Sequence, residues 1–259
     1  RRWYFVLRHG RVGRCQDFIF NYVKLLYKNN LIINILIQAR LNSKRLPGKV
    51  LFKINNTTIL EHVYKKIIKI KNNNKNIKNI IIATSDNKLD NKIYNFCKNK
   101  SIPVFRGKLN NVYDRLTSAA ELYDTDYLIR ISADSPLIDI SLIEYTLNKI
   151  NISNYDLITN VFPRSYPKGQ SFEIISLNLL KENYKNILTS SDKEHVTKYF
   201  YRNSSKFKIF NVKNKYKNLS SFNFAVDTKK DLQRVMFIMK KMKNSDTKNL
   251  IKLYKEFGI

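Results

Sequence analysis

Apolar runs and amphipathic stretches alternate along most of this chain. Mainly apolar stretches of the length expected for strands buried on both faces occur at residues 31–37, 77–84 and 127–131. Apolar residues at helical spacing predict helices at residues 59–70, 89–100, 110–123 and 141–150. Because buried strands and helices alternate in this way, the sequence predicts an α/β fold with a mostly parallel central sheet.

The second half of the chain has a less regular pattern. Short strands are predicted there at residues 156–160, 172–175, 207–212 and 222–226, after a short strand at residues 103–105 in the first half, and helices at residues 177–184, 192–202 and 245–257. A further helix is predicted to begin at Lys229, where Thr228 is a suitable N-cap. No internal repeat or linker is evident, so residues 31–259 are predicted to form one domain.

Residues 1–30 are treated as an unassigned N-terminal extension. A short strand at residues 3–7 and a helix at residues 17–27 are predicted there. The tripeptide Arg8-His9-Gly10 resembles the catalytic tripeptide of histidine phosphatases. We disfavour this interpretation because too few residues precede the next domain and no second catalytic His is evident.

Composition limits the class of protein and its partners. The 259 residues carry a net charge of +28 and are 43% hydrophobic, which is enough to bury a core. Such a charge is compatible with nucleic-acid binding, but the Lys and Arg residues are dispersed and no stacking-aromatic motif accompanies them, so no nucleic-acid partner is expected. The isolated cysteines Cys15 and Cys97, and the lack of an apolar run of about 18 residues, favour a cytoplasmic protein without a membrane span.

A basic loop follows the first apolar run. Arg40, Arg45 and Lys49 alternate there with Ser43 and with the turn-forming pair at residues 47–48. Cations and backbone N–H groups at the end of a strand are suited to binding a polyphosphate. The loop is neither a Walker A motif nor a G-x-G-x-x-G motif, and by composition alone it could equally be a solvated basic loop.

Two further strand ends are predicted to carry a carboxylate, Asp134 after residues 127–131 and Asp227 after residues 222–226. Two carboxylates together with phosphate oxygens form the hard-oxygen site that Mg²⁺ prefers. Each Asp also has an ordinary explanation, since Asp134 precedes a Ser-Pro turn and Asp227 precedes a helix start.

Several motifs in one order resemble those of the CMP-sugar synthetase-like cytidylyltransferases, the superfamily of CMP-KDO and acylneuraminate cytidylyltransferases. The most similar branch is the one named for spore-coat polysaccharide biosynthesis. The motifs are R-x-x-S-x-R-L-P-G-K at residues 40–49, V-F-R-G at 104–107, D-x-P-L-I-D at 134–139, Y-P-x-G-x-x-x-E at 166–173, E-H-V-T at 194–197 and V-D-T-x-x-D-L at 226–232. This resemblance implies a Rossmann-like nucleotide-diphospho-sugar transferase fold.

The resemblance also implies a role for each matching residue. Arg40, Arg45 and Lys49 would be the catalytic cations that bind the triphosphate, with Lys49 best placed to stabilise the transition state. Mg²⁺ would be the cofactor, with Asp134 and Asp227 as its ligands. The other nucleotide-binding residues would be Ala39, Ser43, Thr84, Ser85 and Arg106, and the sugar would contact Arg130, Glu173 and His195.

Three positions depart from the family pattern. Ala133 stands where Gly usually precedes the first metal-binding Asp, and its methyl group is expected to crowd a backbone that approaches the nucleotide. Ser171 replaces a common Asp on the expected sugar side, and Asn111 stands where Asp is frequent. Nucleotide binding is therefore a safer prediction than the identity of the sugar.

The implied reaction is transfer of CMP from CTP to a sugar, expected to be acidic, with release of pyrophosphate, in polysaccharide or surface-glycan biosynthesis. Three alternatives are open. A glycosyltransferase on the same fold would use a nucleotide-sugar, a basic non-catalytic protein would bind nucleic acid, and a degenerate member would bind nucleotide without turnover. A homodimer is also left open, as are the sugar and the purpose of residues 1–30.

Overall fold

The computed structural model describes residues 31–214, 218–243 and 246–258. All of these except Leu31 belong to Ile32–Ile259, the larger of the two units into which the chain divides. The strand and helix predicted within residues 1–30, the Arg8-His9-Gly10 tripeptide and Cys15 lie outside the described residues.

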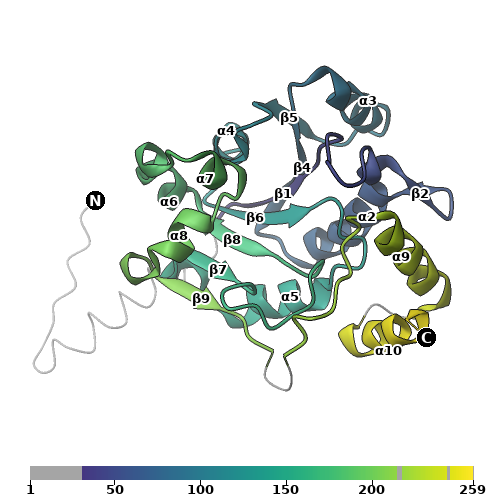
Figure 1. Ribbon diagram of the computed structural model, residues 1–259. Helices are drawn as coiled ribbons and strands as arrows, with labels where there is room; N and C mark the ends of the chain where they lie inside the picture. The colour runs from purple at the N-terminus through teal and green to yellow at the C-terminus, as the bar shows by residue number, and fades with distance from the viewer. Residues whose placement is uncertain (1–30, 215–217, 244–245, 259) are drawn as a thin grey trace, which may run out of the picture. The chain divides into compact units, whose positions relative to one another are not determined.

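A seven-stranded sheet with the order β5-β4-β1-β6-β8-β7-β9 forms the centre of this unit (Figure 1). Its strands are β1 (Ile33–Gln38), β4 (Ile77–Ser85), β5 (Val104–Gly107), β6 (Tyr127–Ser132), β7 (Leu157–Thr159), β8 (Glu173–Ser176) and β9 (Ile209–Asn211). Neighbouring strands are parallel except at β8, which runs antiparallel to β6 and to β7. The mixed, mostly parallel sheet that the sequence predicted is therefore confirmed.

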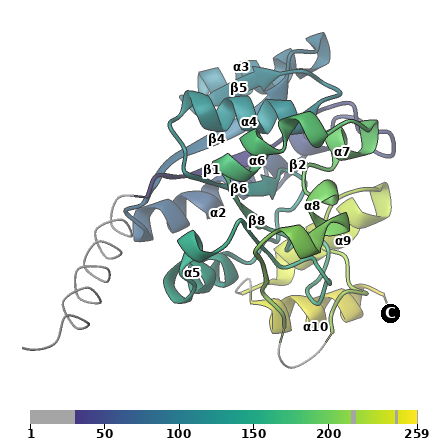
Figure 2. The same cartoon turned by 90° about the vertical axis from the view of Figure 1, so that its left-hand side faces the viewer.

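Helices cover both faces of the sheet (Figures 1 and 2). One hydrophobic core contains apolar residues of α2 (Ile59–Asn73), α3 (Asn91–Asn99) and α5 (Ile140–Lys149). A second core contains apolar residues of α4 (Val112–Leu122), α6 (Leu177–Glu182) and α8 (Lys198–Arg202). Successive residues of β1 alternate between the two, because strand side chains point to opposite faces: Ile35 and Ile37 join the first core and Leu36 the second.

Two C-terminal helices, α9 (Lys229–Lys241) and α10 (Thr247–Phe257), form a third hydrophobic cluster with residues such as Leu46 and Val226. The predicted N-cap of α9 is confirmed, since Thr228 and Asp231 form a reciprocal capping box. The remaining elements are α7 (Ser190–Glu194), the hairpin of β2 (Lys53–Ile54) and β3 (Thr57–Thr58), which the sequence did not predict, and 3₁₀ turns that include η1 (Lys49–Leu51) and η2 (Lys88–Asp90).

The single helix predicted at residues 192–202 was wrong. The structure has α7 and α8 there, separated by three residues at which Val196 adopts a φ of 28°. Val196 is fully buried, and the hydroxyl of Thr197 donates a hydrogen bond to the buried carboxylate of Glu173 at 2.7 Å. These long-range contacts override the helical spacing of the local sequence.

The strand predicted at residues 222–226 was also wrong. Its backbone bonds go to two different segments instead of one neighbouring strand. The Phe224 N–H donates to the Lys168 carbonyl at 2.7 Å, and the Val226 N–H donates to the Asp134 carbonyl at 2.9 Å. Asp227 therefore follows a connecting segment and not a sheet strand, although the segment still brings it beside Asp134.

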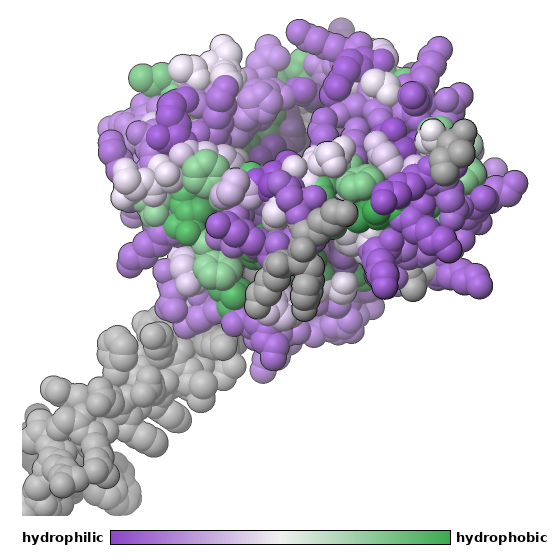
Figure 3. All heavy atoms as spheres, turned by 60° about the horizontal axis from the view of Figure 1, so that its bottom comes forward, coloured by the Kyte–Doolittle hydropathy of each residue, from purple (hydrophilic) through white to green (hydrophobic). Residues whose placement is uncertain are grey.

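Hydrophilic residues cover most of the surface in the view of Figure 3, and hydrophobic residues lie in small separate groups. Among the described residues, none of the helices combines the length and the apolar character that crossing a membrane requires. Cys97 of α3 is a free cysteine buried in the first core, and burial raises the pKa of its thiol to about 12.

Candidate active site

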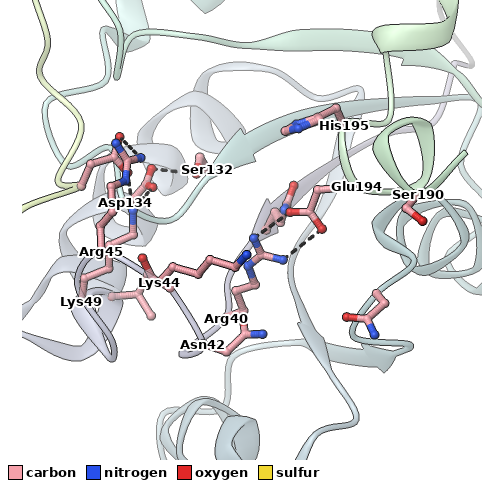
Figure 4. Close-up of a pocket in the computed structure, with 15 residues that line it drawn as sticks. Arg40, Asn42, Lys44, Arg45, Lys49, Ser132, Asp134, Ser190, Glu194 and His195 are labelled. Atoms are coloured by element: carbon pink, nitrogen blue, oxygen red, sulfur yellow. Dashed lines mark hydrogen bonds and ion pairs between the residues drawn. The ribbon is translucent and has the colours of Figure 1, made fainter.

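The carboxyl ends of three neighbouring strands lie side by side. Gln38 of β1 is in register with Ala83 of β4 and with Ser132 of β6, so the loops that follow these strands meet at one edge of the sheet. A cavity of about 710 Å³ lies at this edge (Figure 4). It is lined by Gln38, Arg40, Asn42, Ser43, Lys44, Arg45, Lys49, Val50, Asn110, Ser132, Asp134, Ser190, Glu194, His195 and Asp227.

The basic loop at residues 39–49 is closed by local hydrogen bonds. The Gly48 N–H donates to the Leu41 carbonyl at 2.8 Å, and Gly48 has a φ of +77°, which glycine adopts without steric cost. The Leu41 N–H in turn donates to the buried carboxylate of Asp90 at 2.8 Å. This loop therefore holds its cations along one wall of the cavity. We call residues 39–49 the phosphate loop.

Lys49 joins the two predicted metal-binding carboxylates. Its ammonium nitrogen lies 2.5 Å from Asp134 Oδ2 and 2.9 Å from Asp227 Oδ1, and its side chain is only 8% exposed. The structure thus brings together the three residues to which the sequence assigned the central chemistry. Because one ammonium group contacts both carboxylates, they converge on a single point that a cation can occupy.

One backbone hydrogen bond and two serine hydroxyls hold these two carboxylates in place. The Asp134 carbonyl accepts the Val226 N–H, so the residue before Asp227 is fixed against Asp134. Oδ1 of Asp134 accepts hydrogen bonds from the hydroxyls of Ser132 at 2.7 Å and Ser135 at 3.1 Å. Asp134 is therefore oriented by residues of its own loop, and Asp227 by a backbone contact between two segments that are distant in sequence.

Asp227 contacts two further cations through its other oxygen. Arg45 Nη2 lies 2.9 Å and Lys168 Nζ 2.8 Å from Asp227 Oδ2. Burial acts to raise the pKa of Asp227, but the hydrogen bonds and charges of Lys168 and Lys49 outweigh it and hold the pKa well below its usual range. Asp227 is thus an ionised carboxylate at neutral pH.

The two carboxylates fit a magnesium ion only if a substrate completes its coordination. Across the residues that the structure describes, there is no group of three or more His, Cys, Asp or Glu side chains that could hold a metal ion. Mg²⁺ is commonly bound through one or two carboxylates, with phosphate oxygens and water as its other ligands. Asp134 and Asp227 beside the phosphate loop match that donor set.

Arg40 spans the cavity in the present structure. Its guanidinium forms a bidentate pair with Glu194 at the end of α7, at 2.7 and 3.0 Å (Figure 4). Ser43 lines the same cavity, as does the exposed side chain of His195 next to Glu194. To bind a triphosphate, Arg40 has to exchange the carboxylate of Glu194 for phosphate oxygens.

Arg130 and Glu173, which the sequence assigned to the sugar side, form a partly buried ion pair and do not line the cavity. Arg130 Nη1 lies 2.8 Å from Glu173 Oε2, and Arg130 also donates to Gln38, which lines the cavity. Glu173 Oε1 accepts hydrogen bonds from Thr197 at 2.7 Å and from Tyr201 at 2.5 Å. Both oxygens of Glu173 are thus engaged within the protein, which suits a residue that positions others.

The remaining predicted nucleotide-binding residues do not line the cavity. Thr84 and Ser85 are fully buried, and the Ser85 hydroxyl donates to Asp90. The guanidinium of Arg106 donates to the carbonyls of residues 85 and 87. The Ala39 side chain belongs to the first hydrophobic core. Their predicted contacts with the nucleotide stay predictions.

The three departures from the family pattern have local partners in this structure. The methyl group of Ala133 packs into the first hydrophobic core, so it does not narrow the cavity. Ser171 accepts a hydrogen bond from Arg164 at 2.9 Å. Asn111 caps α4 by accepting the Asp114 N–H at 3.0 Å. The possibility that these departures mark a protein without turnover stays an open alternative.

Sequence reasoning missed the site contacts of Lys168 and Asp90. Lys168 lies 59 positions before its partner Asp227, and its local sequence predicts only a turn. Asp90 is buried and joins the phosphate loop to the end of β4 through Leu41 and Ser85. No local signal distinguishes either residue from the many other charged residues of the chain.

Comparisons with known proteins agree with this geometry. A family model described as cytidylyltransferase matches residues 34–257. An uncharacterized protein of Methanocaldococcus jannaschii is 33% identical over 79% of this chain and 82% of its own length. The spore coat polysaccharide biosynthesis protein SpsF of Bacillus subtilis is 28% identical over 81% and 87%. A 3-deoxy-manno-octulosonate cytidylyltransferase of Hydrogenovibrio crunogenus is 26% identical over 63% and 59%.

Among solved structures, a cytidylyltransferase from Leptospira borgpetersenii is similar in both fold and sequence. It superposes with a TM-score of 0.79 at 28% identity, and the match covers 88% of this chain and 95% of that one. The family model spans most of the chain, including the phosphate loop, Asp134 and Asp227. This chain therefore belongs to the cytidylyltransferase family.

Proposed function

We propose that this protein transfers CMP from CTP to a hydroxyl group of an acidic sugar, with release of pyrophosphate, in polysaccharide or surface-glycan biosynthesis. One observation carries the proposal: Asp134 and Asp227 converge on Lys49 beside a loop rich in cations. The names of two relatives support the substrate class, since one acts in spore coat polysaccharide biosynthesis and the other on 3-deoxy-manno-octulosonate.

In the proposed reaction the acceptor hydroxyl oxygen attacks the α-phosphorus of CTP. A new oxygen–phosphorus bond forms, the bond from the α-phosphorus to the α–β bridging oxygen breaks, and pyrophosphate leaves with that electron pair. The hydroxyl proton passes to solvent. Positioning and charge stabilisation supply most of the catalysis in such a transfer.

The protein's own residues would divide that task. Arg40 and Arg45 would bind the β- and γ-phosphates once they exchange their present carboxylate partners for phosphate oxygens. Lys49 would stabilise charge at the α-phosphate once Mg²⁺ replaces its ammonium group between the two carboxylates. Mg²⁺ would be held by Asp134 and Asp227, where it would stabilise the charge that develops on the phosphate oxygens.

The expected setting of the reaction belongs to the same proposal. CTP and its sugar acceptor are the partners we propose, and the cytoplasm is the proposed compartment because nucleoside triphosphates are available there. The expectations of a homodimer and of no nucleic-acid partner stay predictions.

Pyrophosphate release tests the proposal directly. The protein is incubated with Mg²⁺ and each of the four nucleoside triphosphates against a panel of acidic and neutral sugars, with Asp134→Asn as the control. Release that requires CTP, a sugar acid and an intact Asp134 is the expected result. Omission of Mg²⁺ and its replacement by other divalent ions test the metal.

Two other results would contradict the proposal in different ways. No release with any pairing, together with saturable CTP or CMP binding that Asp227→Asn abolishes, would indicate a glycosyltransferase or a degenerate family member. Absence of any nucleotide binding would refute the site itself.

A further inference from the structure

A cation from the second half of the chain reaches the centre of the site. Lys168 lies in the connection between β7 and β8, and its ammonium nitrogen is 2.8 Å from Asp227 Oδ2. The side chain is 50% exposed, so the ammonium group is accessible to a ligand. Residues 166–169 match the Y-P-x-G motif, and Lys168 stands at the x position, for which the motif specifies no residue type.

The backbone fixes Lys168 at this place. Its N–H donates to the Phe222 carbonyl at 3.0 Å, and its carbonyl accepts the Phe224 N–H at 2.7 Å. The following Gly169 has a φ of +88°, and a Cβ atom there would lie 2.4 Å from the Ala225 nitrogen. Only glycine allows this close approach, so residues 168–169 are held against the segment that leads into Asp227.

The three cations around Asp227 come from two different walls of the site. Lys49 and Arg45 belong to the phosphate loop, whereas Lys168 belongs to the connection between β7 and β8. A metal ion at Asp227 would compete with all three cations for the negative charge of that carboxylate. Lys49 and Arg45 then have the triphosphate beside them, and Lys168 is left on the wall outside the phosphate loop.

Two other cations from this half of the chain, Arg130 and Arg164, have partners that the proposed reaction does not involve. Arg130 is paired with Glu173, and Arg164 donates to the Ser171 hydroxyl at 2.9 Å. Lys168 differs from them because its partner is a carboxylate that the proposed function assigns to Mg²⁺. A metal ion at Asp227 would weaken this ion pair, and the half-exposed ammonium group of Lys168 could then bind another anion.

We propose that Lys168 binds the carboxylate group of the acceptor sugar and so selects acidic sugars over neutral ones. This inference rests on the proposed function. An acidic acceptor must bring a negative charge toward a triphosphate and two aspartates, which repel it. An ammonium group outside the phosphate loop offsets that repulsion, and its short, charge-assisted hydrogen bonds suit a carboxylate.

Lys168→Met tests this assignment with paired acceptors. Each sugar acid of the panel, 3-deoxy-manno-octulosonate among them, is compared with its own carboxamide. For the acids we expect the acceptor KM to rise about 10- to 100-fold in the variant, because the acceptor loses an ion pair. The KM for the carboxamides and the KM for CTP should stay within about twofold, because neither depends on the acceptor carboxylate.

Binding provides a readout that does not require turnover. Calorimetry measures the affinity of the sugar acid for the complex of the protein with Mg²⁺ and α,β-methylene-CTP, and Lys168→Met should weaken it by a similar factor. Lys168→Arg retains the charge and should recover most of the affinity. Lys78→Met removes an exposed lysine at the amino-terminal end of β4, away from the cavity, and should behave as wild type.

The outcomes separate this inference from the proposed function. Equal effects of Lys168→Met on acids and carboxamides, or a raised KM for CTP, would overturn the assignment of Lys168 while CMP transfer stands. CTP-dependent release of pyrophosphate with neutral sugars alone would also overturn it. Absence of release by the wild-type protein with every acceptor would refute the proposed function first.

Discussion

The phosphate loop and the connection between β7 and β8 supply cations to the same carboxylate by different means. The phosphate loop carries Arg40, Arg45 and Lys49 within ten consecutive residues and is closed by bonds between its own members. The connection supplies Lys168 through backbone contacts with a segment more than fifty residues away. One wall of the site is thus a local motif, and the other exists only in the folded chain.

Because of this difference, substitutions in the two walls should have different effects on turnover and on stability. The cations of the phosphate loop lie in one short segment, which the Gly48–Leu41 hydrogen bond closes and the buried Asp90 joins to the end of β4. The β7–β8 connection leads into β8, where long-range contacts join Glu173 to Arg130, Thr197 and Tyr201. Substitutions in the first wall should therefore affect turnover most, and substitutions behind the second wall should affect stability as well.

Lys49→Met should have the largest effect. It removes the ammonium group that contacts both Asp134 and Asp227, and loss of one such electrostatic group typically lowers kcat by about 10²- to 10³-fold. Steady-state release of pyrophosphate measures the change. Lys44→Met is the matched control, because Lys44 is an exposed cation of the same loop without a contact to either Asp, and its effect should be less than about tenfold. A kcat within tenfold of wild type for Lys49→Met would contradict the role assigned to it.

Glu173→Gln should reduce stability by an intermediate amount. The change leaves the partly buried Arg130 without its counter-charge, and the free energy of unfolding should fall by about 3 kcal/mol. Urea denaturation measures the fall. The burial of Tyr201 and the negative charge of Glu173 raise the pKa of the Tyr201 hydroxyl. This hydroxyl therefore stays protonated and donates a hydrogen bond to Glu173. Tyr201→Phe removes the hydroxyl that hydrogen-bonds to Glu173 and Thr159, and it should lower the free energy of unfolding by about 2 kcal/mol. An unchanged unfolding midpoint for Glu173→Gln would show that the pair does not hold this wall.

Asp192→Asn should have the smallest effect, and it should depend on pH. Asp192 of α7 accepts two hydrogen bonds from Arg202 of α8, at 3.1 and 3.2 Å, which lower its pKa although burial opposes the change. A lowered pKa stabilises the fold above the unfolded value of about 3.9, and this contribution is lost as the pH falls through the folded value.

Melting curves at several pH values test this dependence. The wild-type melting temperature should exceed that of Asp192→Asn near pH 7, and the gap should close below about pH 4, where the unfolded carboxyl is already protonated. The substitution should leave the phosphate loop intact. Pyrophosphate release at neutral pH should therefore be the same in Asp192→Asn as in the wild type, and it serves as the control. A gap that is constant across the pH range would contradict the ion pair as its cause.

The sheet was predictable from the sequence because its central strands are buried on both faces. Such strands are continuous apolar runs, and the runs predicted at residues 31–37, 77–84 and 127–131 correspond to β1, β4 and β6. The predictions failed where long-range contacts decided the structure. Thr197 ends a helical pattern through its bond to Glu173, and Val226 leaves the strand pattern to pair with Asp134.

The same distinction between local sequence signals and long-range contacts applies to the candidate site. Lys49, Asp134 and Asp227 were predicted because they stand in short motifs that resemble those of the family, and the structure brings these three side chains together. Lys168 was given no role because a lysine in a Tyr-Pro-Lys-Gly turn has no local feature that indicates its partner. Its position depends on the packing of Gly169 against Ala225, which only the folded chain shows.

Gly169 has a consequence for how this enzyme can diverge in evolution. Any side chain at residue 169 would collide with the Ala225 backbone, so that position is closed to substitution. Its neighbour Lys168 is half exposed and can change without disturbing the fold. A constrained and a free position thus stand side by side, and descendants of this chain could acquire new acceptors through residue 168 while inheriting the same nucleotide site.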